Sequence, residues 1–118
     1  FAPLAALPGV TLYSLQYGSS AADLHKVEPT LSIHEFGEDI DTEHGRFMDT
    51  LAIMKNLDLI ISVDTSICHI AGALNVPTWT LLPHHADWRW LQHRTDSPWY
   101  PSMRLFRQDV NHDWQPVI

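Results

Sequence analysis

The chain has one cysteine, no cluster of lysine or arginine, and no apolar run near the ~20 residues that a membrane-spanning helix needs. A single thiol excludes an internal disulfide and fits a reducing compartment, so we expect a cytoplasmic protein. The formal net charge of −7 argues against nucleic-acid binding through a basic surface and against attraction to an anionic membrane. The sequence also lacks internal repeats, low-complexity tracts and the GxGxxG pattern of dinucleotide-binding proteins.

What is present is a globular composition, with 45% hydrophobic residues in 118. That length is enough for one domain with a real core, but not for two. The first seven residues have the character of a helix end, closed by Pro8 and Gly9. We therefore expect residues 1–118 to be a single domain and an N-terminally truncated fragment of a longer protein.

The central stretch, residues 58–83, predicts a strand, a sharp turn, a helix and a second strand. Residues 58–63 are apolar and rich in β-branched side chains, as in a strand of a parallel sheet. Three small polar residues, 64–66, end that run, and a helix follows to about Leu74. Asn75 tolerates a left-handed cap and Pro77 cannot continue a helix, so the second strand begins near Val76. This order is a compact βαβ unit.

Strand and helix signals alternate along the rest of the chain, with strands predicted at residues 10–16, 31–36 and 102–107 and helices at 20–26 and about 43–56. The fold class is therefore α/β, a Rossmann-like three-layer domain with a parallel sheet of about five strands. In such folds ligands bind outside the carboxyl ends of the strands. The loops expected to converge there are residues 16–20, 64–66 and 84–90.

The predicted central helix has two distinct faces. Ile67, Ile70, Ala71 and Leu74 share the stripe that should pack on the sheet. Thr65, Ser66 and His69 share another face, and a helix start after a parallel strand offers free N–H groups and a positive dipole end to an anion. These residues could cradle a diphosphate. Alternatively, Thr65 and Ser66 only cap the helix and His69 is an ordinary surface histidine.

Metal-binding patterns are incomplete. The acidic residues 38–43 resemble half of a calcium loop, but Gly45 falls one place late and the closing glutamate is missing, so we expect a solvated acidic loop. The tandem His84-His85 lacks partners at a standard ligand spacing. We predict no structural metal and no cofactor, and we interpret Cys68 as a small core residue.

An aromatic segment follows the central unit and has two interpretations. Trp88 and Trp90 flank Arg89, and together with Trp99 they could stack on a base or a sugar. Equally, the three tryptophans could fold over one another and cover the sheet edge. Arg89 and Arg94 are the nearby cations for a phosphate, although each could instead meet a local carboxylate.

Taken together, several segments resemble a known family. They are Ser14-Leu15-Gln16-x-Gly18, Phe47-Met-Asp49-Thr50, residues 58–74 with Asp64-Thr65-x-x-x-His69, Asp87-Trp-Arg-Trp90, and the run from Ser97-Pro-Trp-Tyr-Pro101 to Gln108. Their combination resembles the C-terminal glycosyltransferase-like module of bacterial tetratricopeptide-repeat proteins, which is related to the heptosyltransferases. The resemblance implies one half of a GT-B fold, the half that binds a nucleotide-sugar donor.

In heptosyltransferases the Asp-Thr-x-x-x-His segment contacts the donor, which points to Asp64, Thr65, Ser66 and His69. The catalytic base lies in the facing domain, so the resemblance leaves the catalytic residues of this chain unknown. It implies as partners a nucleotide-diphosphate sugar, a facing Rossmann-like domain and upstream tetratricopeptide repeats of the same protein. The complete set of expected donor-binding residues is Gln16, Gly18, Asp64, Thr65, Ser66, His69, Pro83, Asp87 and Trp88.

The sequence departs from the family in ways that matter. Tyr17 stands where a basic residue is common, which removes one expected phosphate contact, and Ser66-Ile67-Cys68 replaces the more usual Ala-Val-Ala. In the family a further strand lies between the first and third strands of this chain. We expect the order to close up to 2-1-3-4-5, or another chain to fill the gap in a homo-oligomer, since an exposed edge favours association.

Two functions follow from these patterns. The first is the donor-binding part of a glycosyltransferase, with the isolated fragment inactive. The second is a degenerate, non-catalytic scaffold or interaction module of a repeat protein, favoured by Tyr17 and by the low positive charge.

Overall fold

The computed structural model describes residues 1–26, 32–37, 39–111, 113–114 and 117. The chain divides into two compact units, residues 1–50 and residues 51–117. Each contains parallel strands and helices, so the predicted α/β class is confirmed. The first residue of the strand predicted at residues 31–36 lies outside the described residues. Among the described residues, no helix combines the length and apolar character needed to cross a bilayer.

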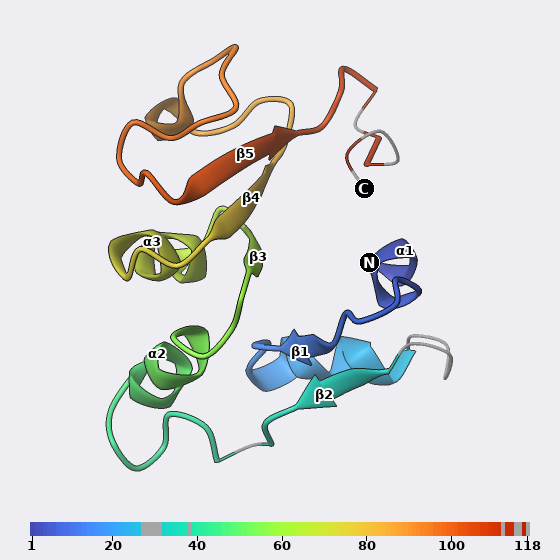
Figure 1. The fold of residues 1–118 in the computed structure, drawn as a ribbon, viewed down its shortest axis with the longest axis vertical. Coiled ribbons are helices and arrows are strands. Elements are labelled where there is room, and N and C mark those ends of the chain that lie inside the picture. Colours follow the sequence, from blue (N-terminus) through green and yellow to red (C-terminus); the bar gives the residue numbers. More distant parts are fainter. Residues whose placement is uncertain (27–31, 38, 112, 115–116, 118) are drawn as a thin grey trace. The chain divides into compact units, whose positions relative to one another are not determined.

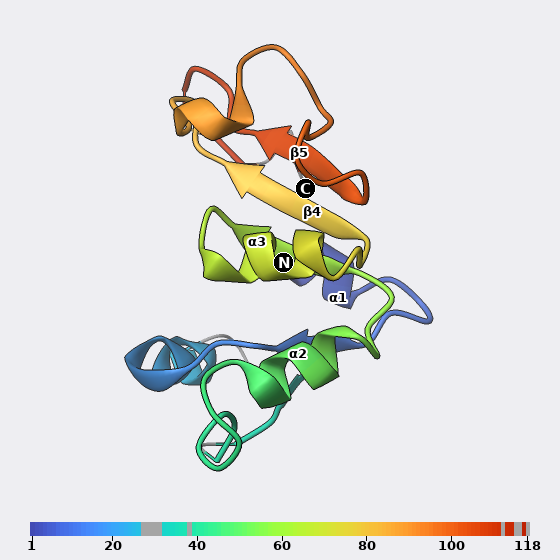
Figure 2. The ribbon, with the colours of Figure 1, turned by 90° about the vertical axis from the view of Figure 1, so that its left-hand side faces the viewer.

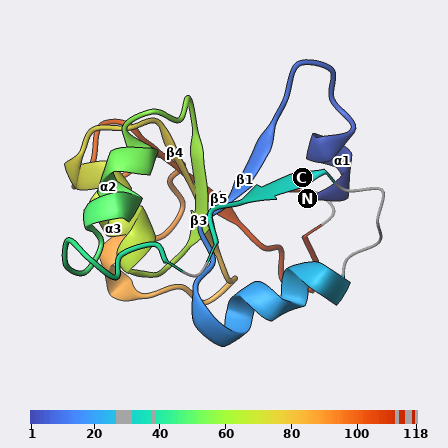
Figure 3. The ribbon, with the colours of Figure 1, turned by 90° about the horizontal axis from the view of Figure 1, so that it is seen from below.

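The first unit contains α1 (Ala2–Ala5), β1 (Leu12–Ser14), the 3-10 helix η1 (Gly18–Lys26) and β2 (Ile33–Glu35). β1 and β2 are parallel, with Tyr13 opposite His34. The Tyr13 ring stacks on His34 and on Phe36, with centroids 5.1 and 5.6 Å apart. Figure 3 shows η1 beside this pair of strands. The residues after β1 therefore turn directly into a helix at the carboxyl end of the strand.

The acidic loop before the second helix is a helix cap. The Asp41 carboxylate accepts hydrogen bonds from the amides of Asp49 (2.7 Å) and Thr50 (3.1 Å) and from the Thr50 hydroxyl (2.6 Å). In return Asp49 Oδ2 accepts from the Asp41 amide at 2.7 Å. Burial would raise the pKa of Asp41, but the hydrogen bonds, led by the Thr50 hydroxyl, lower it. The loop that we expected to be merely solvated instead fixes the start of a helix.

That helix, α2 (Met48–Met54), begins later than the expected residues 43 or 44. Gly45 and Phe47 have φ angles of +96° and +66°, which a right-handed helix cannot include. Met54 is fully buried, whereas Met48, at the first position of the helix, is 51% exposed.

The second unit contains β3 (Ile60–Val63), α3 (Ser66–Ala73), β4 (Thr78–Leu82), the 3-10 helix η2 (Trp88–Trp90) and β5 (Met103–Arg107). Its three strands are parallel in the order β3-β4-β5, with α3 packed against β3 and β4 (Figure 1). The arrowheads of β4 and β5 point the same way, and η2 lies beyond the end of β4 (Figure 2). The loops that follow β3 and β4 therefore share one edge of the sheet.

The strand order differs from the expected 2-1-3-4-5 at one place. The pairs β1-β2, β3-β4 and β4-β5 form as predicted. The described strands make one sheet of two and one of three instead of a single sheet of five. β1 and β3 belong to separate compact units, and each unit has its own sheet.

The core of the second unit lies between α3, the sheet and the segment around η2. Cys68 is fully buried within it, which confirms the interpretation of this cysteine as a small core residue. Asn75 has a φ of +56°, so the predicted left-handed cap is also confirmed. The amides of Asn75 and Val76 bond the carbonyls of Gly72 and Ala71, the two bonds of a Schellman motif. The clustered core residues are Cys68, Leu82, Trp90, Met103 and Leu105.

Candidate functional site

The turn between β3 and α3 leaves the start of the helix without a side-chain cap from its N-cap residue. Asp64 follows the last residue of β3, and Thr65 is the N-cap in an extended conformation (φ −138°, ψ 176°). The Thr65 hydroxyl lies 3.4 Å from the Ser62 hydroxyl and makes no capping hydrogen bond. The interpretation that Thr65 serves only as a side-chain cap is therefore wrong. An uncapped helix start suits an anion, because its first N–H groups need partners.

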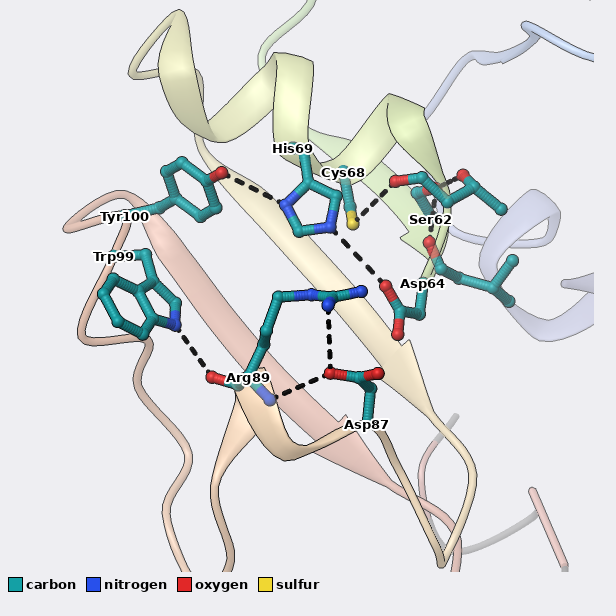
Figure 4. A network of polar contacts seen from close by, with 10 residues as sticks. Ser62, Asp64, Cys68, His69, Asp87, Arg89, Trp99 and Tyr100 are labelled. Carbon is teal, nitrogen blue, oxygen red and sulfur yellow. Dashed lines mark hydrogen bonds and ion pairs between the residues drawn. The ribbon is translucent and has the colours of Figure 1, made fainter.

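The His69 imidazole has three neighbours, and Figure 4 shows two of them, Tyr100 and Asp64. Nδ1 lies 3.1 Å from the Tyr100 hydroxyl, and Nε2 lies 3.6 Å from Asp64 Oδ1. The ring stacks on Trp90 with centroids 5.2 Å apart and planes 20° apart. The side chain is still 32% exposed, whereas Trp90 is fully buried. His69 is thus neither a free surface histidine nor a core residue, but an oriented, partly accessible ring.

Asp64, Cys68 and His69 each bring one potential metal ligand within 4.8 Å of the others. Burial, followed by the charge of Asp64, raises the pKa of the Cys68 thiol. The thiol also donates a hydrogen bond to the Thr65 carbonyl at 3.1 Å. Because the thiolate is the metal-binding form of cysteine, this environment favours a structural thiol over a ligand.

The loop after β4 presents a second set of side chains at the same edge. Asp87 Oδ1 accepts from the Arg89 amide at 3.0 Å and lies 3.4 Å from Arg89 Nη1. The Arg89 guanidinium lies over the Trp88 ring, 5.8 Å from its centroid, and Trp99 Nε1 donates to the Arg89 carbonyl at 2.8 Å. Trp88 is 71% exposed and Trp99 is 54% exposed. The aromatic segment therefore divides: Trp90 belongs to the core, and Trp88 and Trp99 face solvent.

The arginines near this loop are engaged. Arg94 makes a two-point contact with Asp96, at 2.8 and 2.6 Å, which raises the pKa of Arg94 and lowers that of Asp96. Arg89 pairs with Asp87, so each of these two arginines contacts a local carboxylate, which was one of the two alternatives expected from the sequence. Arg107 Nη2 donates to the carbonyls of Trp90 (2.9 Å) and Leu91, and burial lowers the pKa of Arg107. Arg107 thereby ties the end of η2 to β5.

In the first unit, Gln16 and Gly18 line a cavity of about 450 Å³ at the carboxyl ends of β1 and β2. Gly18 has a φ of +66°, a conformation that favours glycine. The Gln16 amide donates to the Ser14 hydroxyl at 3.2 Å. Tyr17, Glu35 and Phe36 also line this cavity, so its wall combines aromatic rings with polar groups.

The structure brings together several of the predicted site residues and adds others. The turn between β3 and α3 contains four of them: Asp64, Thr65, Ser66 and His69. The loop with Asp87 and Trp88 meets this turn where Trp90 stacks on His69. Pro83 is exposed at the start of that loop, and Gln16 and Gly18 lie in the other unit. Sequence reasoning did not predict that Trp90 and Tyr100 contact the His69 ring. The Ser-Pro-Trp-Tyr-Pro segment was a signal for Tyr100, but a motif does not reveal which side chain it contacts.

Comparison with known proteins places these observations in a family. The model of glycosyltransferase family 9 (heptosyltransferase) matches residues 46–114, which include β3, α3, β4, η2 and β5. Protein FlbA of Caulobacter vibrioides is 28% identical over 118 residues, 98% of this chain, and the chain spans only 19% of the length of FlbA. No solved structure matches the chain. Since the family match covers more than half of the sequence, the chain belongs to glycosyltransferase family 9, the heptosyltransferase family.

Proposed function

We propose that this chain binds the diphosphate of a nucleotide-sugar donor, as part of a glycosyltransferase that transfers a sugar from that donor. The observation that carries the proposal is the His69 ring, fixed by three neighbours and 32% exposed, one turn after a helix start that lacks a side-chain cap. The family match over residues 46–114 supports it, because that match includes this turn and the aromatic loop beside it.

The proposed chemistry is electrostatic. The diphosphate gains negative charge as the bond to the sugar breaks, and preorganised donors at that position stabilise the developing charge. The amides of the first turn of α3 and the His69 imidazole are the donors, with the hydroxyls of Thr65 and Ser66 beside them. Asp64 repels phosphate, so its role is to orient His69 through the 3.6 Å contact or to hold a sugar hydroxyl.

The rest of the donor has two proposed contacts. Pro83, Asp87 and the exposed Trp88 ring would meet the base or the sugar, because aromatic faces stack on both. Gln16 and Gly18 line the cavity of the first unit, and the proposal that they contact the donor rests on the family resemblance alone.

In the intact protein we propose that residues 1–118 form the donor-binding half of a GT-B fold, preceded by a facing domain and by tetratricopeptide repeats. The facing domain would supply the catalytic base, so this chain by itself transfers no sugar.

The test is a calorimetric titration of ADP, GDP, UDP and their sugar conjugates into the intact protein. We expect His69→Ala to weaken binding about 10- to 100-fold, since a hydrogen bond to a charged group contributes about 1.5–3 kcal/mol. His93→Asn is the control, because His93 is exposed and asparagine tolerates its φ of +59°. Equal affinity of His69→Ala and the unaltered protein would refute the assigned role.

A scaffold that binds no donor is the second candidate function. Two observations favour it: Arg89 and Arg94 are both engaged by carboxylates, and Tyr17 occupies a position that is often basic in this family. For a scaffold, none of these nucleotides or nucleotide sugars would raise the thermal unfolding midpoint of the intact protein. A donor-binding protein would be stabilised in proportion to the ligand concentration above its dissociation constant.

A further inference from the structure

Tyr100 packs directly on the backbone of α3 at Gly72. A Cβ atom at position 72 would lie 2.4, 2.7 and 2.8 Å from the Cγ, Cδ1 and Cδ2 atoms of the Tyr100 ring. Real Cβ atoms essentially never approach so closely, so alanine at this position requires the ring to move. Gly72 is buried, and its ordinary helical conformation shows that space for the ring, not backbone freedom, is what requires glycine.

The Tyr100 ring also contacts His69. The Tyr100 hydroxyl lies 3.1 Å from His69 Nδ1, and the two rings meet edge-on with centroids 5.8 Å apart. On the opposite side of the imidazole, Nε2 faces Asp64 at 3.6 Å, as Figure 4 shows. A carboxylate near Nε2 favours a proton on that nitrogen, which leaves Nδ1 as the acceptor and makes the tyrosine hydroxyl the donor.

We propose that Tyr100 is a positioning residue: its hydroxyl donates to Nδ1, keeps the N–H on Nε2, and holds that N–H on the side of the β3–α3 turn. Gly72 is the residue that admits the Tyr100 ring to this place. The stack on the buried Trp90 prevents the imidazole from tilting, so the hydroxyl sets the remaining rotation about the ring axis. That the N–H then meets a diphosphate rests on the function proposed above, whereas the tautomer and the ring orientation do not.

The first experiment measures the tautomer without any ligand. The intact protein is labelled with ¹⁵N-histidine, and the His69 signals are identified by their loss in His69→Gln. We expect a single tautomer protonated at Nε2, and in Tyr100→Phe a shift of both ring nitrogens toward a mixture of tautomers. Tyr13→Phe, which removes the hydroxyl of a tyrosine in the other unit, should leave them unchanged. Unchanged His69 signals in Tyr100→Phe would overturn the proposal.

The second experiment tests the part played by Gly72. Gly72→Ala should displace the Tyr100 ring, reproduce the nitrogen shifts of Tyr100→Phe and lower the thermal unfolding midpoint. In the double variant Gly72→Ala/Tyr100→Ala the clash is gone, so the midpoint should partly recover while the His69 signals remain altered. Recovery of the original His69 signals in the double variant would overturn the proposal, as would wild-type signals in Gly72→Ala.

Binding separates this inference from the proposed function. With UDP, GDP and ADP as probes, Tyr100→Phe should weaken the binding seen in the unaltered protein about threefold to tenfold. Altered His69 signals combined with unaltered nucleotide affinity would leave Tyr100 as the positioning residue and refute the diphosphate role of His69. Unaltered His69 signals with weakened affinity would refute the positioning role.

Discussion

The two α-helices that follow polar loops, α2 and α3, begin in opposite ways. The first-turn amides of Asp49 and Thr50 in α2 are bonded by the Asp41 carboxylate, at 2.7 and 3.1 Å. At α3 the N-cap residue is Thr65, and its hydroxyl makes no capping bond. Both helices begin with backbone N–H groups that have no partner inside the helix. In α2 a carboxylate of the chain accepts from two of these groups, whereas in α3 the N-cap side chain accepts from none.

The unpaired N–H groups of a helix start can serve stability in one place and binding in another. A helix start that receives a carboxylate from its own chain is a stable element with its anion already in place. A helix start without a side-chain cap, beside an oriented histidine, has its donors available to an outside anion. A carboxylate of the chain therefore meets the first amides of α2, whereas the start of α3 is the one proposed to receive an outside anion. Substitutions at each helix start can test this difference.

The largest expected effect is at α2. Asp41→Ala removes the acceptor of three hydrogen bonds and leaves alanine at a φ of +61°, so it should destabilise the helix by about 2 kcal/mol. Hydrogen exchange of residues 48–54 in the intact protein should be faster by about 30-fold. Asp39→Ala, at an exposed position of the same loop, is the control and should change exchange little. Equal protection in the two variants would show that the cap contributes nothing.

A smaller effect should follow from giving α3 a carboxylate of its own. Thr65→Asp places a negative charge at the N-cap, which should stabilise α3 by about 0.5–1 kcal/mol and weaken nucleoside diphosphate binding at least about tenfold. Thr65→Asn is the matched control, because it offers a cap without the charge and should cost less affinity. If Thr65→Asp bound the nucleotide as well as the unaltered protein, the anion would not lie at this helix start.

The smallest effect is the pH dependence of the α2 cap. The pKa of Asp41 is lowered in the folded state, so its contribution to stability is present above the unfolded value of 3.8 and is lost as the pH falls through the folded value. The unfolding midpoint of the unaltered protein should exceed that of Asp41→Asn by a constant amount from pH 7 to about pH 4. Below about pH 4 the difference between the two midpoints should shrink. The unaltered protein should lose about 1 kcal/mol or less of its free energy of unfolding as Asp41 becomes protonated. A difference that grew on acidification would contradict the assignment.

Much of the second unit could be predicted from local pattern. The run of β-branched residues before Asp64 predicts a strand, and Asn75 predicts the left-handed end of α3, because each depends on neighbours within a few residues. Boundaries set by distant contacts were missed. The helix α2 begins only at Met48 because Gly45 and Phe47 have positive φ angles, and the carboxylate that caps it belongs to Asp41, eight residues before its bonding partner Asp49.

The stripe predicted for α3 was also shifted by tertiary packing. The buried positions of that helix are Cys68, Ala71 and Gly72, whereas Ile67, Ile70 and Leu74 are only partly buried. The small residues lie inside because the Tyr100 ring and the neighbouring strands occupy the space that a larger side chain would need. Periodicity identifies the amphipathic helix, but side-chain volume on neighbouring elements decides which face is innermost.

By itself the sequence determined the α/β class, the strand–turn–helix–strand order of the central unit, and the presence of polar residues and a histidine at its turn. These features depend on local periodicity, turn chemistry and the order of elements, all of which are written along the chain. Only the tertiary structure decided that His69 lies between Trp90, Tyr100 and Asp64, since two of these side chains come from positions more than 20 residues away. A contact of that kind depends on how strands and loops meet in space, and no local pattern encodes it.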